Sequence, residues 1–240
     1  MNIYDDEHFF RSYIELRSGA NYNDILETPA ILSLIGDVKG KRILDIGCGF
    51  GKTDAALSDA GASFILGIDI SEKMIGKARE ENSRGNIEYR VLSAEAISSL
   101  DGSFDIVMSS LCFHYIKDLS RLLSSVHSLL SEHGILVFST EHPLTTASYD
   151  GHYMEDGNGW SGYCFSDYGR EGKRESLWFE RPVTTYHRMF STVVNSLLDN
   201  GFAIRRIAEP LPDDEALGKI GRMIREYHKP SFIIIKAERI

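Results

Sequence analysis

The sequence feature that most limits the fold is an apolar strand that runs directly into a glycine loop. Residues 43–52 read ILDIGCGFGK, with an acid, Asp45, just before glycines spaced G-x-G-x-G at Gly47, Gly49 and Gly51. Glycine permits backbone angles that other residues avoid, and it lets a ligand approach the main chain closely. The pattern is typical of the first strand-to-helix turn of a nucleotide-binding α/β sheet.

A second acid, Asp69, ends the next expected strand, residues 64–70, about twenty residues beyond the loop. A carboxylate there accepts hydrogen bonds from both hydroxyls of a ribose. A dinucleotide fingerprint needs a third glycine where Lys52 stands. Asp45 would also repel a pyrophosphate but attract the ammonium of a methionine moiety. The acids therefore favour S-adenosylmethionine over NAD, and a glycine-rich turn without any ligand is the alternative.

Composition excludes several classes of partner. The chain has 240 residues, 42% of them hydrophobic, and a formal net charge of -9, which argues against nucleic acid or an anionic membrane as partner. Its cysteines, Cys48, Cys112 and Cys164, show no C-x-x-C spacing, so neither a disulfide framework nor a zinc site is indicated. With an acidic N-terminus and no long apolar run, we expect a cytoplasmic protein.

Alternating periodicities predict a doubly wound α/β fold with a parallel sheet, helices on both faces and a ligand at the carboxyl ends of the strands. The expected strands are residues 42–46, 64–70, 88–92, 104–109, 135–140, 203–207 and 232–237. The expected helices lie within residues 5–36 and at 53–60, 72–82, 119–130, 185–200 and 214–226.

We expect a single domain, residues 1–240, with four parts. These are a helical lid segment (5–36), a cofactor-binding core (37–142), a substrate cap inserted after strand five (143–184) and the last helix and strands (185–240). The cap segment has no clear periodicity and is rich in glycine, aromatic and charged residues. Irregular segments of this length commonly act as lids.

Four motifs in order, ILDIGCGFGK, GIDIS, FDIVMSSLCFHYIKD and HGILVFSTEHP, make the chain resemble the class I S-adenosylmethionine-dependent methyltransferases. The match covers roughly residues 40–142, and the tail is similar to a bacterial subgroup of unassigned substrate. The resemblance implies a Rossmann-like sheet of seven strands, with the last strand antiparallel and inserted beside the fifth. It identifies fold and cofactor but no substrate.

The resemblance also assigns cofactor contacts residue by residue. The methionine part is implied to lie against the glycine loop, including Cys48, with Asp45 near its amino group. Asp69 is implied to bind the ribose and Ile70 to pack on the adenine. The family's acid after strand three is replaced here by the segment Ser93-Ala94-Glu95, which leaves the backbone N–H of Ala94, with Glu95 beside it. Ser110 and Leu111 are implied to line the sulfonium end.

Three histidines are candidates for a general base, which is needed only if the accepting atom carries a proton. His142 follows strand five with Glu141 beside it, and we expect it to face the ligand crevice. His114 follows strand four, and His187 is expected to open a helix. The alternatives are structural: a strand-end cap for His142, packing for His114 and a bond to the helix cap for His187.

Aromatic residues of the cap and N-terminal segment are suited to enclosing a small molecule, although several must form the cap's own core. They are Tyr153, Trp160, Tyr163, Phe165, Tyr168, Trp178, Phe179, Tyr13 and Tyr22. The acids are scattered, so we predict no metal. The hypothesis is methyl transfer to an O or N atom of a small metabolite. The rivals are an NAD-dependent oxidoreductase and a non-catalytic S-adenosylmethionine-binding regulatory protein, and the sequence does not indicate an oligomeric state.

Overall fold

A seven-stranded sheet forms the centre of the computed structural model, which describes residues 2–147, 152–159 and 161–240. The strand order is β10-β11-β5-β4-β1-β2-β3. The strands are β1 (Arg42–Ile46), β2 (Phe64–Asp69), β3 (Ile87–Val91), β4 (Phe104–Ser109), β5 (Leu130–Glu141), β10 (Phe202–Ala208) and β11 (Phe232–Arg239). Neighbours from β3 to β5 pair in parallel, whereas β11 is antiparallel to both β5 and β10. The predicted fold class, including the inserted antiparallel last strand, is confirmed.

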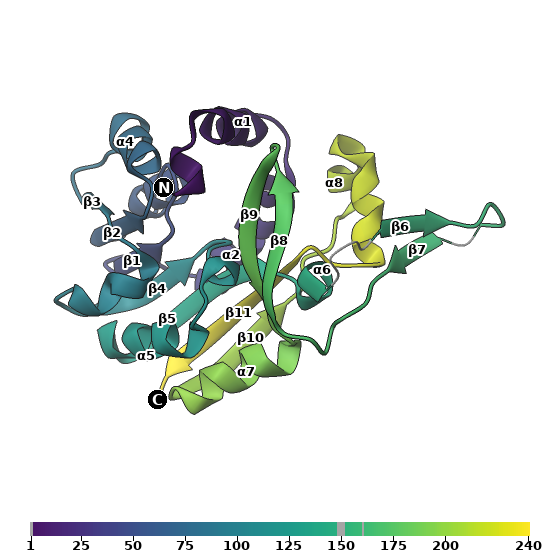
Figure 1. The fold of residues 1–240 in the computed structure, drawn as a ribbon. Coiled ribbons are helices and arrows are strands. Elements are labelled where there is room, and N and C mark those ends of the chain that lie inside the picture. The colour runs from purple at the N-terminus through teal and green to yellow at the C-terminus, as the bar shows by residue number, and fades with distance from the viewer. Residues whose placement is uncertain (1, 148–151, 160) are drawn as a thin grey trace.

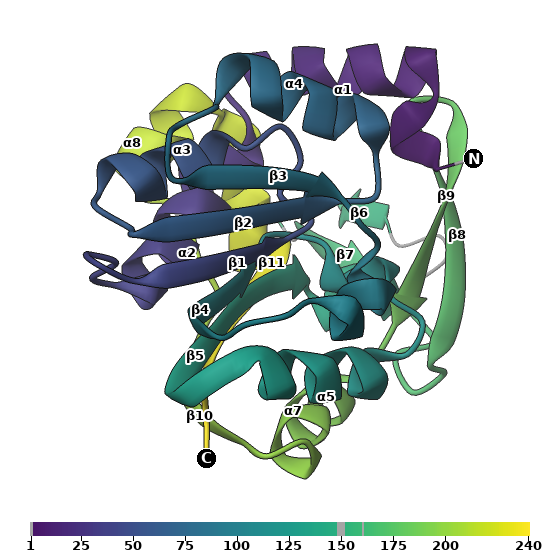
Figure 2. The same ribbon diagram turned by 90° about the vertical axis from the view of Figure 1, so that its left-hand side faces the viewer.

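Helices cover both faces of this sheet (Figures 1 and 2). The α-helices are α1 (Glu7–Ser18), α2 (Thr28–Ile35), α3 (Lys52–Asp59), α4 (Glu72–Glu81), α5 (Leu119–Leu129), α6 (Pro143–Ala147), α7 (Phe190–Asp199) and α8 (Asp214–Lys219). Shorter helical turns are η1 (Ile3–Asp5), η2 (Asn23–Glu27), η3 (Ala94–Ser99), η4 (Phe113–Tyr115) and η5 (Gly221–Tyr227). Several helices begin at a residue whose side chain accepts a hydrogen bond from a first-turn N–H group, which has no partner within the helix. Ser71, for example, accepts from Met74 N at the start of α4.

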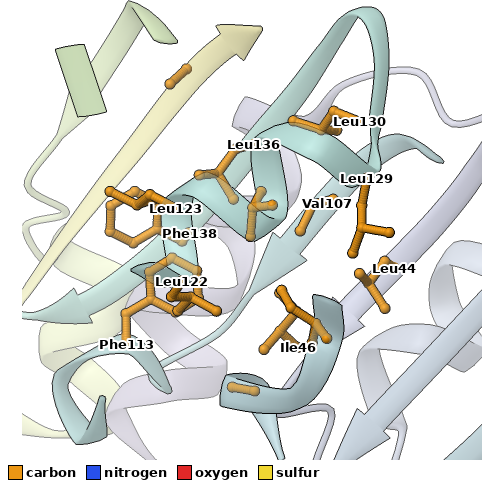
Figure 3. Close-up of a cluster of buried hydrophobic side chains, with 14 of the residues drawn as sticks. Leu44, Ile46, Val107, Phe113, Leu122, Leu123, Leu129, Leu130, Leu136 and Phe138 are labelled. Carbon is orange, nitrogen blue, oxygen red and sulfur yellow. The ribbon is translucent and has the colours of Figure 1, made fainter. Parts of the chain in front are cut away.

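The two faces of the sheet carry separate apolar cores because side chains alternate along each strand. On β1, Leu44 and Ile46 join the core beneath α5 and α7, whereas Ile43 joins the core beneath α2 and α3. Figure 3 shows the first of these cores, where Leu122 and Leu123 of α5 and Phe138 of β5 meet. Helices therefore pack on both faces of the sheet, and this packing fixes the positions of the strand ends.

The N-terminal segment is helical, as predicted. Asp6 caps α1 by accepting from Phe9 N, and Pro29 stands in the first turn of α2, which ends at Gly36 with a φ of 79°. Between α1 and α2, the turn η2 has π-helical hydrogen bonding. Such segments are uncommon and are often found at functional sites.

The segment after β5 differs from the prediction. Instead of an irregular cap, it forms α6 and two antiparallel hairpins, β6 (His152–Glu155) with β7 (Ser161–Cys164) and β8 (Gly172–Trp178) with β9 (Arg181–His187). Residues 185–187 belong to β9, so the predicted helix begins later, at Phe190. The reason is burial with a period of two, since Val183, Thr185 and His187 all point inward.

The two hairpins lie apart. In Figure 1, β6 and β7 project away from the sheet, whereas the tip of β8 and β9 reaches α1. The β6–β7 hairpin rests on the C-terminal region, where Arg225 stacks 3.9 Å from the ring centre of Tyr153 and Lys229 lies 4.5 Å from that of Tyr163. Trp160 lies outside the described residues. No helix in the described part of the chain is long and apolar enough to cross a membrane.

Candidate functional site

A cavity of about 620 Å³ lies at the carboxyl ends of β1, β2 and β4. Its floor includes Asp45, Asp69 and Ser110, each at or just beyond the end of a strand. Its roof comes from the N-terminal segment and from the β8–β9 hairpin, through Tyr13 and Trp178 among others. This is the edge at which doubly wound sheets bind ligands.

The glycine loop turns at one end of the cavity. Gly47, Gly49 and Gly51 have φ values of 80°, 55° and 76°, the left-handed region that favours glycine. A Cβ on Gly47 would lie 2.7 Å from Cβ of Cys112, and one on Gly51 would lie 2.2 Å from the hydroxyl of Tyr89. A Cβ on Gly49 would meet no atom within 4 Å. The space that a side chain at Gly49 would fill is therefore open to the cavity.

Gly51, for which a cofactor contact is predicted, lies outside the cavity lining. It caps α3 and packs on Tyr89, and it is absent from the cavity lining, whereas Gly47, Cys48 and Gly49 all belong to that lining. The third glycine of the loop is thus required by packing between the loop and β3.

Asp45 is a buried acid with one side-chain oxygen, Oδ1, that lacks a donor. It is 2% exposed and lines the cavity, and its Oδ1 has no hydrogen-bond partner among the described residues. Burial raises the pKa of Asp45 to about 7, with help from the nearby carboxyl groups of Asp69 and Glu27. An orphaned buried carboxylate oxygen is costly unless a donor or a cation reaches it.

Asp69 is anchored by the main chain of the two turns that it joins. Its Oδ2 accepts from Gly49 N at 3.0 Å and its Oδ1 accepts from Ser71 N at 2.8 Å. Each carboxylate oxygen has a second lone pair, so both can still accept from a ligand. Ile70, next along the chain, is an apolar side chain that is 53% exposed at the cavity edge.

A buried acid that the sequence did not single out, Glu27, supports the strand-four end of the cavity. Its Oε1 accepts from Ser139 Oγ at 2.5 Å and from Ser110 Oγ at 2.9 Å, and it is 0% exposed. Ser139 Oγ in turn accepts from the backbone N–H of Leu111 at 2.9 Å. Leu111 has a φ of 52°, a strained conformation for leucine.

Aromatic rings close the cavity from above. Tyr13 and Phe9 of α1 pack edge-on against Trp178, with ring centres 5.9 and 5.3 Å apart. The hairpin turn beside Trp178 is formed by Phe179 and Glu180, both with positive φ, the geometry of a tight two-residue turn. Phe179 stacks on Trp178 and meets Phe9 at 5.4 Å, which offsets the strain of that turn.

Comparison with known proteins assigns the family. Residues 44–138 match a model described as a methyltransferase domain. A solved S-adenosylmethionine-dependent methyltransferase from Mesorhizobium loti is 36% identical, with a TM-score of 0.83, over 88% of this chain and 96% of that one. The chain belongs to the S-adenosylmethionine-dependent methyltransferases. An uncharacterised protein of Haemophilus influenzae is 36% identical to this methyltransferase over 100% of the chain and 98% of its own length.

Other relatives match over part of their length. A ubiquinone biosynthesis O-methyltransferase from Sinorhizobium fredii is 35% identical over 105 residues, which is 43% of this chain and 42% of that enzyme. The match therefore spans less than half of that enzyme.

The residues at the carboxyl edge of the sheet fit S-adenosylmethionine, the cofactor of the family. Asp45 presents an orphaned oxygen that an ammonium would satisfy, and Gly49 leaves room for close approach to the loop. Asp69 has acceptor capacity for ribose hydroxyls, and the exposed Ile70 offers an apolar surface for adenine.

The remaining cofactor residues predicted from the sequence also line the cavity. They are Cys48, Ala94, Glu95, Ser110 and Leu111. Ser93 caps η3 by accepting from Glu95 N at 3.2 Å, so its side chain is engaged within the turn. That leaves the main chain of Ala94 as the polar group of this turn available to an adenine.

Arg17 is a further cavity residue that the sequence did not indicate. Its Nη1 donates to Asn21 at 2.9 Å and its Nη2 pairs with Asp24 at 3.0 Å, while Nε has no partner in the described ranges. It lies on the same wall as Lys52, which pairs with Asp24 at 2.8 Å. Both cations are thus paired with Asp24 rather than with the acids of the floor.

His142 does not face the crevice, which corrects the sequence prediction. Its Nε2 contacts Glu209 Oε1 at 2.8 Å, its Nδ1 accepts from Leu144 N at 3.1 Å, and it is absent from the cavity lining. Both ring nitrogens are thus engaged: Nε2 joins the end of β5 to the chain that follows β10, and Nδ1 caps the start of α6. His142 therefore acts as a cap at the end of β5, which is the structural alternative that the sequence offered.

His187 does not open a helix, and it too lies away from the cavity. It ends β9 and is 0% exposed, its Nε2 lies 2.9 Å from the carbonyl of Tyr168, and its Nδ1 lies 2.8 Å from Thr146 Oγ1. The carbonyl can only accept, so Nε2 is the protonated nitrogen and Nδ1 accepts from the threonine hydroxyl. Burial lowers the pKa of His187, which keeps the ring neutral.

His114 alone of the three histidines lines the cavity. Its Nδ1 accepts from Glu141 N at 3.4 Å, so the neutral ring carries its proton on Nε2. Burial lowers its pKa below the ordinary histidine value. His114 is therefore placed to donate a hydrogen bond rather than to remove a proton.

Glu141, the last residue of β5, also lines the cavity. No residue in the described ranges forms a hydrogen bond or ion pair with its carboxylate, and Tyr115 of the same wall keeps its proton because burial raises the Tyr115 pKa. No group of three potential metal ligands occurs within the described ranges, and the absence of a metal from the reaction stays a prediction.

Replacing Asp69 by alanine should weaken binding of S-adenosylhomocysteine by about 1.5 to 3 kcal/mol, since a charge-assisted hydrogen bond to the ribose is lost. Titration calorimetry measures this directly, and a thermal melt reports whether the loss of the Gly49 and Ser71 contacts unfolds the variant. Unchanged affinity would mean that the ribose lies elsewhere.

Proposed function

We propose that the protein transfers a methyl group from S-adenosylmethionine to an O or N atom of a small metabolite that binds beneath α1 and the β8–β9 hairpin. The observation that supports this proposal is the cavity that lies at the carboxyl edge of the sheet and is lined by residues of α1 and of the β8–β9 hairpin. At about 620 Å³ it lies within the range of small-molecule sites and must hold both molecules. A macromolecular acceptor would have to displace the packed rings of Phe9, Tyr13 and Trp178.

The acceptor end of the cavity carries groups suited to an O–H or N–H nucleophile. The cofactor supplies a methyl group activated on a sulfonium. Glu141 accepts the proton of the nucleophile, and His114 donates from Nε2 to orient it. The hydroxyl of Tyr115 lies 3.0 Å from that of Tyr4, and its raised pKa keeps it protonated. With Tyr4 as the donor of that pair, Tyr115 donates a further hydrogen bond to the nucleophile. Alignment in a water-poor site provides much of the rate of such a displacement.

The part of the chain expected to act as the cap needs revision within this proposal. We expect the acceptor to be enclosed by N-terminal residues, through Tyr4 and Tyr13, and by only the β8–β9 portion of 143–184, through Trp178 and Val183. Tyr153, Tyr163, Phe165 and Tyr168 do not line the cavity, and neither does Tyr22. The name of the ubiquinone O-methyltransferase relative supports oxygen as one of the accepting atoms.

Incubation with a metabolite panel and S-adenosylmethionine carrying a deuterated methyl group tests the proposal. We expect one product that carries the label, together with an equal amount of S-adenosylhomocysteine. If calorimetry shows binding of S-adenosylhomocysteine but no small molecule is ever labelled, the non-catalytic regulatory alternative is favoured. Labelling of protein or RNA alone would show that the acceptor is a macromolecule.

A further inference from the structure

A second buried acid lies behind Asp45 and takes no part in the site as described so far. Asp54, in the first turn of α3, is 0% exposed, and neither of its side-chain oxygens receives a hydrogen bond from any donor of the described chain. A Cβ on Gly67 of β2 would lie 2.6 Å from Asp54 Oδ2, so the carboxyl group is packed directly on the sheet. Asp54 does not line the cavity.

Asp54 lies beside Asp45 on the sheet, because Asp54 Oδ2 packs on Gly67, the residue of β2 that is the register partner of Asp45 in β1. Each carboxyl group also affects the pKa of the other as a hydrogen-bonding neighbour. Two ionised carboxylates have no proton to share, so this contact requires that one of them is a neutral acid. Asp54 is the more enclosed of the two, and burial together with the Asp45 charge raises its pKa well above the ordinary value. Asp45 is the member that faces the cavity.

No cation of the described chain neutralises this pair. The other carboxyl groups that act on Asp45 are Asp69 and Glu27, both acidic. Lys52, which lines the same cavity, is paired with Asp24 at 2.8 Å. A positive charge for Asp45 must therefore arrive from the cavity.

The remaining titratable groups around Asp54 are neutral near pH 7. Burial raises the pKa of the Cys48 thiol and of the Tyr89 hydroxyl, both of which face the acid. Arg84, whose charge acts on Tyr89, is paired with Asp59 at 3.1 Å. Tyr89 Oη lies 3.3 Å from the carbonyl of Gly51, to which it donates, so its proton is not available to Asp54.

We propose that Asp54 is a neutral acid that donates its O–H to Asp45 and so presents Asp45 Oδ1 to the α-ammonium group of the cofactor. Asp54 is thus a positioning residue. The proposed role of Asp54 rests on the proposed function because it places the amino group of the cofactor at Asp45. The ammonium keeps its own protons, Asp54 keeps its proton, and the O–H bond of protonated Asp45 breaks to release a proton to solvent.

The direction of the pH dependence follows from the ionisation of Asp45. With the pKa of Asp45 at about 7 in the free protein, a ligand that needs its carboxylate must displace a proton below that pH. The affinity for an ammonium-bearing ligand therefore rises with pH, by about tenfold from pH 6 to pH 8 for a single group of this pKa, and then levels off. At pH 7 roughly half a proton should leave for each ligand bound.

Titration calorimetry with S-adenosylhomocysteine, in buffers of different ionisation enthalpy, tests the proposal without any turnover. 5′-Methylthioadenosine is the matched control ligand, because it has the same nucleoside but lacks the amino acid part. We expect proton release and the tenfold pH dependence for S-adenosylhomocysteine only. Equal proton release with both ligands, or none with either, would overturn the proposal.

Two variants separate donation by a neutral acid from a role for negative charge. Asp54→Asn keeps a donor and should retain the affinity and pH dependence of the wild type, whereas Asp54→Leu should weaken binding at pH 7 by at least about tenfold, the cost of losing a hydrogen bond to a charged group. Tighter binding and a flat pH profile in Asp54→Asn would show that Asp54 is ionised. If Asp54→Leu does not fold, the comparison of Asp54→Asn with the wild type still tests the proposal. Failure of S-adenosylhomocysteine to bind at all would instead contradict the cofactor site itself.

Discussion

Replacing Glu141 by glutamine should lower kcat by about 10²- to 10⁴-fold, the usual contribution of a positioned general base. Glutamine has nearly the same shape but cannot accept and hold a proton from an O–H or N–H nucleophile. The backbone N–H of residue 141 still donates to His114, so the wall of the cavity is expected to stay in place. Single-turnover rates with the acceptor found by the metabolite panel measure the effect on the chemical step.

The control for this variant comes from the same strand. Glu132, near the start of β5, is exposed and distant from the cavity lining, so Glu132→Gln should leave kcat unchanged. Affinity for S-adenosylhomocysteine should be the same in Glu141→Gln and the wild type, because Glu141 is proposed to act on the acceptor. A Glu141→Gln enzyme with wild-type kcat would show that the nucleophile needs no base or loses its proton to another group.

Replacing Glu27 by alanine should reduce the free energy of unfolding by about 2 to 4 kcal/mol and weaken cofactor binding as well. The change removes the acceptor for the hydroxyls of Ser110 and Ser139 and leaves a void at a fully buried position. Without Ser139 held in place, the strained backbone of Leu111 loses its support at the cavity floor. Urea denaturation and calorimetry with S-adenosylhomocysteine report the two effects separately.

A matched buried acid provides the control. Glu226 accepts from Ser231 N at 2.6 Å and from Ser231 Oγ at 2.8 Å, and it is 5% exposed, but it does not line the cavity or contact its floor. Glu226→Ala should lower stability while leaving cofactor affinity unchanged. If Glu27→Ala also left the affinity unchanged, Glu27 would be a purely structural residue.

The pH dependence of the free energy of unfolding tests whether Glu27 titrates as a buried acid or only fills a buried volume. Burial raises its pKa, so the native state holds the proton to a higher pH than the unfolded state does. The native state binds more protons in that interval, and the free energy of unfolding therefore falls as pH rises through it. In Glu27→Gln this group no longer titrates, so the stability of Glu27→Gln relative to the wild type should improve between pH 4 and the raised pKa.

The sheet could be predicted from sequence because its signals are local. Strands β1 and β4 begin and end where the apolar runs predict, and α4 begins at the predicted residue, Glu72. The cap could not be predicted because its hairpins depend on distant partners. Trp178 and Phe179 meet α1, and Tyr153 meets Arg225. No residue near these positions in the chain signals such contacts.

Some residues of the candidate site could likewise be predicted from local sequence signals, and others could not. Asp45, Gly47 and Asp69 could be found from spacing, because parallel strands bring their carboxyl ends to one edge of the sheet. The histidines could not be ranked, because a ring nitrogen is free or engaged according to its tertiary neighbours. Glu209 engages His142 from 67 residues away. Glu27 and Asp54 gave no local signal, since burial alone distinguishes them from solvent-exposed acids.

The sequence by itself determined the fold class, the methyl donor and the loop that contacts it. The reason is that the alternation of strands and helices is a local pattern, and the glycine spacing and the acids at the ends of β1 and β2 lie within one stretch of the chain. Only the tertiary structure decided which polar groups face the acceptor. Burial and long-range hydrogen bonds withdraw His142 and His187, leave Glu141 open to the cavity, and place Asp54 behind Asp45. Desolvation and hydrogen-bond pairing are properties of the packed molecule, and the order of residues does not contain them.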